Sequence, residues 1–194
     1  MLSNRLAKHF GAAAAAAVVV GSANAAIVHW ADANLTIPNT IDGLYINVET
    51  RATGSSGGST AGWDINPYSA TALTFFNATG SGIFRLPGAT TPSNVPVGTM
   101  ISSAGTYGAG SASTSSAVGA WVLNGENYFG FRFVAADGGT KYGFGRFVIG
   151  AALNGADRMI SDLWYEDSGA GIMVPAPGAV ALLGLAGLAG RRRR

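Results

Sequence analysis

NYFGFRFVAADGGTKYGFGRFVIG, residues 127–150, carries the strongest indication of the fold. Phe129, Phe131 and Phe133 alternate with other residues, so their side chains share one face of an extended strand. The segment Asp137-Gly138-Gly139 follows, and it can form a tight turn because glycine tolerates a positive φ. A second apolar run comes after the turn. The stretch therefore predicts a β-hairpin that places three aromatic rings in a core.

The two strands of this hairpin differ in what they place on each face. Arg132 alternates with the phenylalanines and is expected on the outer side. Gly143 and Gly145 share one face of the return strand. Positions without side chains leave either a flat groove or room for bulky rings from the neighbouring strand, and the sequence leaves both alternatives open.

The rest of the middle region has the same β-strand character. Over residues 27–167, short apolar or alternating runs are separated by clusters of Gly, Ser, Thr and Asn, with no helical periodicity. One such run covers residues 44–49, and the last covers residues 159–166. About seven to ten short strands at this spacing predict an all-β fold, a single β-sandwich of jelly-roll-like type over residues 26–168.

Charge is unevenly distributed along the 194 residues. The formal net charge is +2, but six of the 12 basic residues lie in the terminal segments 1–25 and 178–194, while all 10 acidic residues lie between them. The middle region is therefore mildly acidic and has no basic cluster, which argues against nucleic-acid binding. The absence of cysteine excludes disulfides, thiolate metal ligands and cysteine nucleophiles.

Residues 1–25 contain the three parts of a secretory signal peptide in the usual order. A positively charged start precedes an apolar run over residues 10–20, which is too short to span a bilayer. Ala23 and Ala25 then provide the small residues that signal peptidase requires, with cleavage before Ala26. We therefore expect a signal helix that is removed on export.

The end of the chain also has an ordered series of parts. Residues 169–177 are predicted to form a linker whose prolines keep it extended and accessible. The apolar run 178–190 would span roughly 20 Å as a helix, which is short against a hydrocarbon core of about 30 Å. We expect it to be a short transmembrane helix. The basic tail that follows consists of Arg191, Arg192, Arg193 and Arg194. It is expected to stop transfer and to stay in the cytoplasm.

The segment Val174-Pro175-Ala176-Pro177, the apolar run and the terminal arginines together resemble the PEP-CTERM sorting signal of Gram-negative bacteria. Ala176 stands where the usual form has glutamate, as in the VPAP variant of such tails. The resemblance implies two processing partners, signal peptidase and an exosortase-like membrane protease. It also implies a Sec-type export signal, a transient stay in the inner membrane, and a final place at the cell surface or in the extracellular matrix. A plain C-terminal membrane anchor is the alternative.

The middle region also resembles small exported proteins that carry this kind of tail, in bacteria that make exopolysaccharide. The similar segments are mostly aromatic: Gly62 to Pro67, Tyr128 to Phe133, Tyr142 to Phe144, and Trp164 to Glu166. They imply a shared fold rather than a shared chemistry.

Few residues could support catalysis. Residues 54–58 spell G-x-S-x-G around Ser56, but a nucleophile elbow needs a strand before it and a helix after it, and a Gly/Ser loop surrounds this serine. His29 is the one histidine after the signal segment, so a Ser–His pair would depend on it. No spacing selects a glycosidase pair from the available carboxylates, which include Glu126, Asp137, Asp162, Glu166 and Asp167.

Two binding functions also fit particular residues. Asp64 and Asn66 share one face of a strand and could hold Ca²⁺ with loop oxygens, although a turn at Asn66-Pro67 explains them as well. One histidine after the signal segment and no cysteine make a zinc site a poorer fit. Aromatic rings could stack on sugars or could belong to the core, and the candidates are Trp63, Tyr68, Trp121, Trp164 and Tyr165.

We therefore expect a non-catalytic exported protein without a cofactor, sorted through its tail and associated with exopolysaccharide or biofilm. A carbohydrate-binding module is the first alternative, and it would need an accessible aromatic surface. A secreted hydrolase is the second alternative, and it would need a Ser–His pair or a carboxylate pair that converges in the fold.

Overall fold

The computed structural model describes residues 26–176, and every regular element in that range is a β-strand. All strand pairs are antiparallel. Within these residues, no helix is long and apolar enough to cross a membrane. The all-β prediction is confirmed for the described range, and the several antiparallel sheets are consistent with a β-sandwich. The expected signal helix over 1–25 and transmembrane helix over 178–190 lie outside the described residues.

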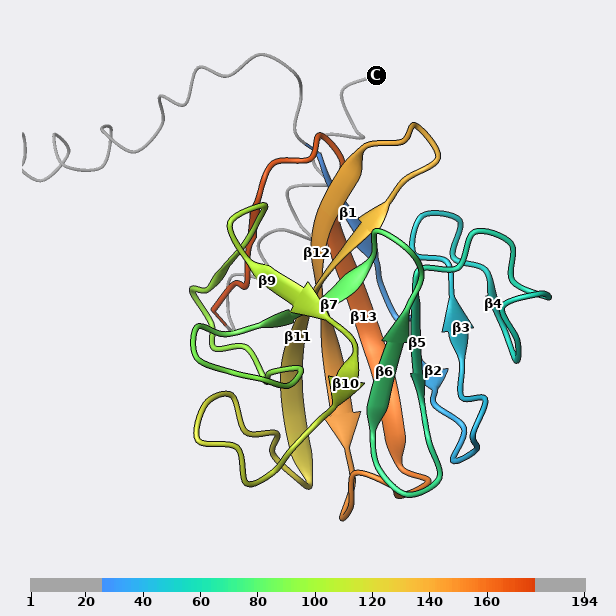
Figure 1. Ribbon diagram of the computed structural model, residues 1–194, viewed down its shortest axis with the longest axis vertical. Coiled ribbons are helices and arrows are strands. Elements are labelled where there is room, and N and C mark those ends of the chain that lie inside the picture. Colours follow the sequence, from blue (N-terminus) through green and yellow to red (C-terminus); the bar gives the residue numbers. More distant parts are fainter. Residues whose placement is uncertain (1–25, 177–194) are drawn as a thin grey trace, which may run out of the picture.

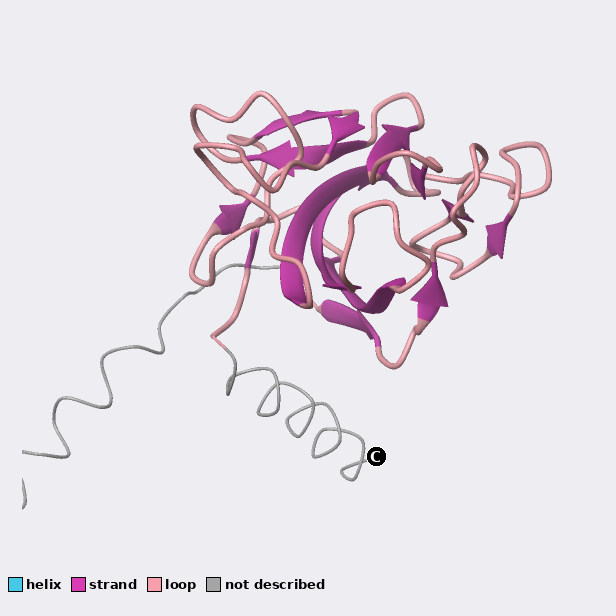
Figure 2. Ribbon diagram, turned by 90° about the horizontal axis from the view of Figure 1, so that it is seen from below, coloured by secondary structure: helices cyan, strands magenta, loops and turns pink. Residues whose placement is uncertain are grey.

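The larger sheet contains seven strands (Figure 1). Its long central strands are β11 (Gly125–Val134), β12 (Thr140–Ile149) and β13 (Arg158–Glu166). Figure 2 shows these strands curving around the interior of the domain. The order along the sheet is β1-β13-β12-β11-β7-β9, and β2 also pairs with β13. The short strands are β1 (Ile27–Trp30), β2 (Leu35–Thr36), β7 (Gly82–Arg85) and β9 (Thr106–Gly108).

The second sheet has five short strands in the order β10-β6-β5-β3-β4. Its inner side chains, such as Ile46, Ile65 and Phe75, pack with the phenylalanines of β11 in one continuous core. The two sheets therefore enclose a shared apolar interior, which we call the inner core. The strands of the second sheet are β3 (Tyr45–Ile46), β4 (Thr53–Gly54), β5 (Ile65–Tyr68), β6 (Thr74–Asn77) and β10 (Gly110–Ser111).

The predicted hairpin is confirmed. β11 and β12 pair along their whole length, and the connecting turn contains Asp137-Gly138-Gly139. Gly138 has a φ of 80°, and Gly139 N–H donates a hydrogen bond to Asp137 Oδ1 at 2.7 Å. The inner core fully buries the three rings that the alternation predicts there: Phe129, Phe131 and Phe133.

The two glycines of the return strand lie beneath those rings. In the antiparallel register Gly143 is opposite Phe131, and Gly145 is opposite Phe129. A Cβ atom at Gly143 would lie 2.4 Å from Phe131 Cζ, and a Cβ atom at Gly145 would lie 2.4 Å from Phe129 Cε1. Aromatic rings therefore cover both glycines, and the alternative of a flat open groove at this place is wrong.

The outer face of the long strands is also buried over part of its length, which the sequence did not predict. A two-stranded sheet, β8 (Met100–Ile101) and β14 (Ile172–Met173), packs there. Its residues join outward-facing rings of the long strands, such as Phe144 and Trp164, in a second buried apolar cluster. We call this cluster the outer core.

Arg132 illustrates the consequence of the outer core. It alternates with the phenylalanines as expected, so it lies on the outer face of β11. There its guanidinium carbon is 4.9 Å from the centre of the Tyr107 ring on β9, which is a cation–π distance. Its Nε atom is buried and has no hydrogen-bond partner among residues 26–176. The predicted outward position of Arg132 is therefore confirmed, and the structure adds that this side is packed.

A buried arginine joins several loops to the start of β13. Arg158 is 1% exposed, and burial lowers the pKa of its guanidinium. All of its side-chain donors are used by backbone carbonyl oxygens, which belong to Ile37, Pro38, Ser69, Ala72 and Leu153. One side chain thus ties three separate segments of the chain to the long sheet.

Candidate functional site

The last strand of the domain carries the beginning of the candidate sorting motif. β14 pairs with β8, and the ladder continues one residue further. Val174 N–H donates to Thr99 O at 3.0 Å, and Gly98 N–H donates to Val174 O at 2.7 Å. The Val174 side chain is fully buried in the outer core. The first residue of the motif is therefore a structural part of the fold.

This placement corrects the predicted domain boundary. The sequence predicts a domain over 26–168 and a linker over 169–177, but the chain is packed onto the domain as far as Val174. Pro175 is then half-buried, and Ala176 is exposed. The physical reason is that Ile172 and Val174 fill the outer core. The other residues assigned to processing and sorting lie outside the described range: Ala23, Ala25, Pro177, Arg191, Arg192, Arg193 and Arg194.

The predicted mature N-terminus lies beside the end of β13. β1 begins at Ile27, which pairs with Glu166. Ala26 N–H donates a hydrogen bond to Asp167 Oδ1 at 2.8 Å, and Asp167 N–H donates to Ala26 O at 3.1 Å. Ala26, where cleavage by signal peptidase is predicted, is therefore held against the fold by two hydrogen bonds.

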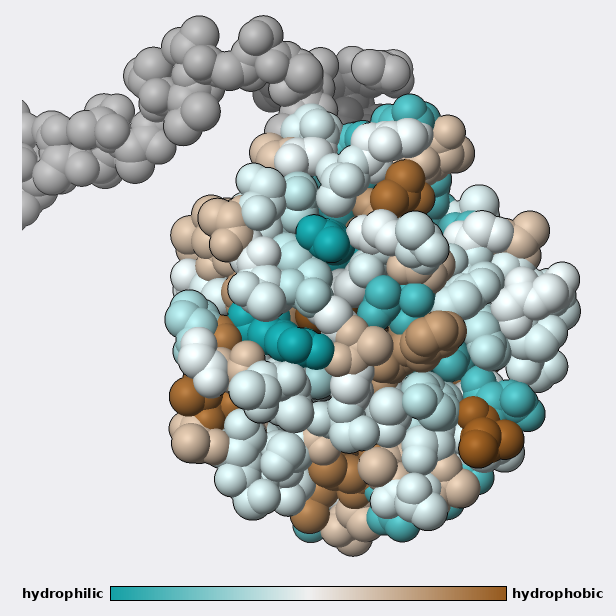
Figure 3. Space-filling model, viewed as in Figure 1, coloured by the Kyte–Doolittle hydropathy of each residue, from teal (hydrophilic) through white to brown (hydrophobic). Residues whose placement is uncertain are grey.

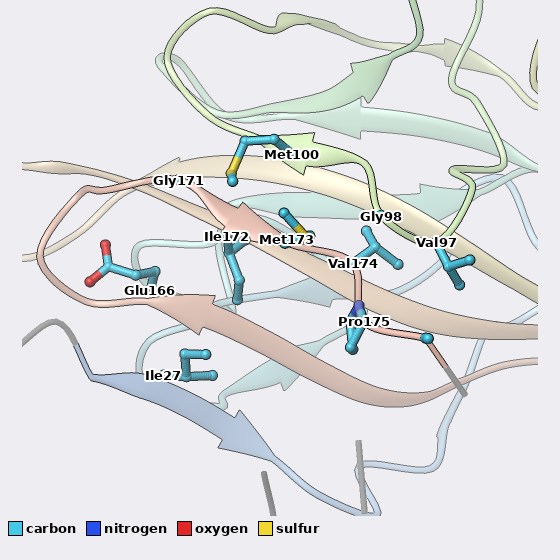
Figure 4. Close-up of a pocket in the computed structure, with 11 residues that line it drawn as sticks. Ile27, Val97, Gly98, Met100, Glu166, Gly171, Ile172, Met173, Val174 and Pro175 are labelled. Atoms are coloured by element: carbon cyan, nitrogen blue, oxygen red, sulfur yellow. The ribbon is translucent and has the colours of Figure 1, made fainter. Parts of the chain in front are cut away.

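An open groove of about 640 Å³ lies where the N-terminal and C-terminal strands meet (Figure 4). The segment from Gly171 to Pro175 crosses the view, with Ile27 on one side of it and Val97 and Met100 on the other. The lining is almost wholly apolar. Glu166 is its ionisable lining residue, and this side chain is buried. Four large hydrophobic residues are 45–54% exposed here: Ile27, Val97, Met100 and Met173.

The sequence did not indicate this groove. Its walls come from three segments that are far apart in the chain, around Ile27, Met100 and Met173. β8 and β14 have two residues each, which is too short for an alternating pattern to be recognised. The only hint is that 95–101 and 171–174 are both short and apolar, and neither segment shows in its own sequence which partner it takes.

Two of the candidates for sugar stacking are buried. Trp121 is 2% exposed, and its Nε1–H donates to Pro92 O at 2.9 Å. Trp164 is 3% exposed and stacks on His29 and on Phe144, with ring centres 4.4 and 4.8 Å away. His29 and Phe144 come from the strands on either side of β13, so both faces of the indole are covered. A sugar-stacking role for Trp121 and Trp164 therefore does not fit the fold.

Trp63 lies in a more accessible aromatic group on the outer face of the second sheet. Its ring meets Tyr45 edge to face with centres 4.9 Å apart, and it lies 5.7 Å from Phe76. Phe76 is 51% exposed, whereas Trp63 and Tyr45 are half-buried. Tyr165, another candidate, packs edge to face on Phe133 of the inner core at 5.1 Å. Tyr45, Trp63 and Phe76 therefore form the accessible group, with two members that the sequence did not select.

Asp64 and Asn66 are both buried and hydrogen-bonded within the fold. Asp64 Oδ2 accepts a hydrogen bond from Val48 N–H at 2.8 Å, and Asn66 Nδ2 donates to Asp42 O at 2.9 Å. Burial raises the pKa of Asp64 to about 6, although the hydrogen bond from Val48 acts in the opposite direction. Among residues 26–176, no group of three or more His, Cys, Asp or Glu side chains could hold a metal ion. The contacts seen for this pair are structural ones.

A polar cluster on the outer face joins three residues that the sequence had singled out separately: His29, Asp162 and Glu126. His29 Nε2 lies 3.3 Å from Asp162 Oδ1, and Arg146 Nη2 donates to Asp162 Oδ2 at 2.6 Å. Glu126 Oε1 lies 3.3 Å from Arg146 Nη1. Burial opposes ionisation of Asp162, but hydrogen bonds with Arg146, Ser161 and Asp32 N–H and the charge of Arg146 together outweigh it, so the pKa of Asp162 is lowered. The cluster neutralises a largely buried carboxylate.

Ser56 is hydrogen-bonded elsewhere. Its hydroxyl donates to Ser59 Oγ at 3.0 Å, and residues 55–62 form turns and bends with no helix after the serine. The G-x-S-x-G segment therefore lacks the strand–turn–helix arrangement of a nucleophile elbow, as the sequence predicts.

Asp137, one of the candidate carboxylates, pairs with Lys141 Nζ at 2.9 Å beside the hairpin turn.

Comparison with known proteins found no match: no protein-family model matches this chain, and neither a curated protein nor a solved structure is similar to it.

Proposed function

We propose that this chain is a non-catalytic exported protein with a PEP-CTERM-like tail. The tail holds the chain in the inner membrane, an exosortase-like protease cuts it there, and the domain reaches the cell surface or extracellular matrix. One observation supports the proposal. Ala26 and Ala176, which adjoin the two proposed processing sites, lie at the same end of the domain: Ala26 is hydrogen-bonded to Asp167 just after β13, and Ala176 lines the groove together with Ile27.

That location suits a domain attached to a membrane through its C-terminus. Only Pro177 separates Ala176 from the apolar run 178–190, and the arginines that follow favour the cytoplasmic side. The domain is then held on the side to which the signal peptide exports it. The jelly-roll-like topology of the sandwich, the signal helix and the transmembrane helix over 178–190 belong to the same proposal.

A non-catalytic role is supported by the contacts of the candidate catalytic groups. His29 stacks on Trp164 and its Nε2 faces Asp162, whose charge is neutralised by Arg146. Ser56 is hydrogen-bonded within its own loop. His29 and Asp162 therefore make contacts that connect neighbouring strands, and Ser56 makes contacts within one exposed loop, which fits a structural component of a surface layer or matrix. An association with exopolysaccharide or biofilm is part of the proposal through the resemblance of the tail.

Variants of the tail test this proposal in a host that has a matching exosortase. Replacing Pro175 and Pro177 by alanine should leave the chain in the membrane but block cutting, because the extended segment that the protease reads is lost. The full-length form should then accumulate in the membrane fraction on immunoblots. Normal processing of this variant would contradict a PEP-CTERM-like tail and favour a plain anchor.

A matched variant tests membrane retention separately. Replacing Arg191, Arg192, Arg193 and Arg194 by serine leaves the prolines and the apolar run intact and removes the charged stop. We expect uncut chain to appear in the soluble exported fraction. If this variant is retained and cut as efficiently as the unaltered chain, the proposed role of the basic tail is wrong.

A carbohydrate-binding function is the second candidate, and the accessible group of Tyr45, Trp63 and Phe76 favours it. Aromatic faces of this kind can stack on sugar rings. A glycan array probed with the mature chain should then show binding that Phe76→Ala weakens. Val122→Ala is the control, because Val122 is also 51% exposed. Equal binding by both variants would contradict a sugar site at this group.

A further inference from the structure

The exposed hydrophobic residues of the domain are concentrated around the groove. Four of the eight large hydrophobic residues that the described range exposes line it: Ile27, Val97, Met100 and Met173. The other four belong to separate segments: Ile41, Phe76, Val122 and Val134. On the face seen in Figure 3, apolar side chains lie in small separate groups among polar ones. The groove therefore gathers half of the exposed large hydrophobic residues of the described range in one place, which is typical of an interaction surface.

The chain itself limits how far this surface can be from a membrane that holds the tail. Ala176 lines the groove, and the apolar run begins at Gly178. Two residues span at most about 7 Å, even when the backbone is fully extended. If residues 178–190 enter a bilayer, the groove end must therefore lie within the depth of the headgroup layer, and no long flexible connection keeps it away.

The fold also fixes the direction in which the tail leaves the domain. Val174 is fully buried and hydrogen-bonded to Thr99 and Gly98, so the chain cannot swing away from the domain before Pro175. Met100 and Met173 are directly opposite each other in the β8–β14 ladder, and both are about half exposed. The exposed side chains of Met100 and Met173 therefore lie beside the point where the chain leaves the outer core at Val174.

We infer that the groove end of the domain docks on the lipid surface of the membrane that retains the tail. The inference rests on the proposed function, since it takes the tail to be inserted in a bilayer. Ile27, Val97, Met100 and Met173 insert into the boundary between headgroups and acyl chains, where apolar side chains of interfacial proteins lie roughly 5–10 Å deep. Docking presents the segment after Val174 at the membrane surface, where a membrane protease acts.

The chemistry of the groove favours lipid over a charged partner. Its ionisable lining residue, Glu166, is 4% exposed, and Glu166 Oε1 accepts a hydrogen bond from Ser168 N–H at 2.9 Å. The exposed lining is therefore apolar. Glu166 Oε2 has no hydrogen-bond partner among residues 26–176, but this atom is buried and not part of the exposed surface. Asp167, the next residue along the chain, accepts a hydrogen bond from Ala26 N–H. Neutral phosphatidylcholine is for this reason a sufficient probe of the surface.

The absence of cysteine allows a direct test with single-cysteine variants of the chain from Ala26 to Arg194. Met173→Cys places a fluorescent label in the groove, and Val122→Cys is the matched control, since the two residues are 54% and 51% exposed. Val122 N–H is hydrogen-bonded to Asn127 near the start of β11, at the other end of the long strands. The vesicles are phosphatidylcholine, with or without bromine atoms on the acyl chains near the headgroups.

We expect brominated vesicles to quench the label at position 173 about twofold or more, given the depth of interfacial side chains, and to leave the label at position 122 unchanged. Equal signals from the two positions on vesicle-bound chain would overturn the docking inference while the proposed membrane retention stands. A label at position 173 that is shielded from water before vesicles are added, and that bromine does not quench, would also overturn the inference. That result would indicate that the tail or a second copy of the chain covers the groove. Failure of the chain to bind vesicles would contradict the membrane step of the proposed function itself.

A second variant separates docking from tethering. Met100→Glu places a charge on the exposed side of the groove without touching a buried side chain. The tail should still bind the vesicles, but a label at Val97→Cys should lose its quenching by brominated lipid, because a carboxylate is costly to bring into the interface. Unchanged quenching at position 97 would contradict docking by this face. Thermal unfolding of the Val97→Cys chain, with and without Met100→Glu, checks that the fold is retained.

Discussion

The inner core and the outer core cover opposite faces of the same long strands, but they are built in different ways. The inner core uses long-strand side chains, such as Phe129 and Phe131, that cover the glycines directly opposite them. The outer core depends on two-residue strands and on Val174 near the end of the described chain. A cut after Val174 would therefore leave both cores complete, whereas a cut before it would open the outer one. The difference explains how a tail can be removed without unfolding the domain.

The largest effect is expected in the inner core. Phe131→Ala should lower the free energy of unfolding by about 3–5 kcal/mol, because it removes a fully buried ring and leaves a cavity above Gly143. Arg132→Ala is the matched control on the other face, and it should cost about 1 kcal/mol or less, the usual value of a partly exposed cation–π contact. Urea denaturation measures both. Equal losses would show that the assigned register and the contrast between the faces are wrong.

A second test uses the buried carboxylate of Asp64, next to the second sheet. Its pKa is about 6 in the fold, against an ordinary value of 3.8, so protonation favours the folded state. The stability from this group is present below about pH 4 and is lost as the pH rises through 6, a change of about 3 kcal/mol. Asp64→Asn keeps an acceptor for Val48 N–H and cannot ionise.

The measurement for Asp64 is the unfolding free energy between pH 4 and pH 8 for both chains. The unaltered chain should lose stability relative to Asp64→Asn over this range, while other ionisable groups affect both chains alike. Parallel pH profiles would contradict a raised pKa of Asp64 in the folded state.

The smallest of these effects is expected at the outer core. Val174→Ala should lower the free energy of unfolding by about 2 kcal/mol, because two buried methyl groups are lost. Met173→Ala, one residue earlier and 54% exposed, is the control and should cost much less. Thermal denaturation can compare the two. If both substitutions are equally mild, Val174 does not close the outer core, and the tail begins earlier than the structure indicates.

The parts of the fold that could be predicted are those that a local sequence pattern indicates. The alternation around Phe131 and the turn at Asp137-Gly138-Gly139 identify the hairpin, its faces and its direction, because a strand repeats every two residues. The cover of the outer face could not be predicted, since β8 and β14 are too short to show a period. Arg158 was missed for a related reason: its carbonyl partners come from segments that are brought together only by the fold.

The candidate site was predicted in part. The order of residues from Val174 onward predicts a sorting tail, and this stays a prediction. The burial of Val174 could not be predicted, because it depends on pairing with Thr99 and Gly98. His29 and Asp162 could be named as polar candidates, yet their contact spans 133 residues of sequence. Trp164 was predicted as a possible binding ring, and only the register of β1, β12 and β13 reveals that its two faces are occupied.

We propose that the chain is trimmed at both ends up to the folded domain and not into it. Mass spectrometry of the mature protein from its native host tests this directly, because both termini are read in one measurement. We expect Ala26 as the first residue and a last residue beyond Val174, within the segment 175–190. An intact chain of 194 residues, or an end that falls between Ile27 and Val174, would contradict it.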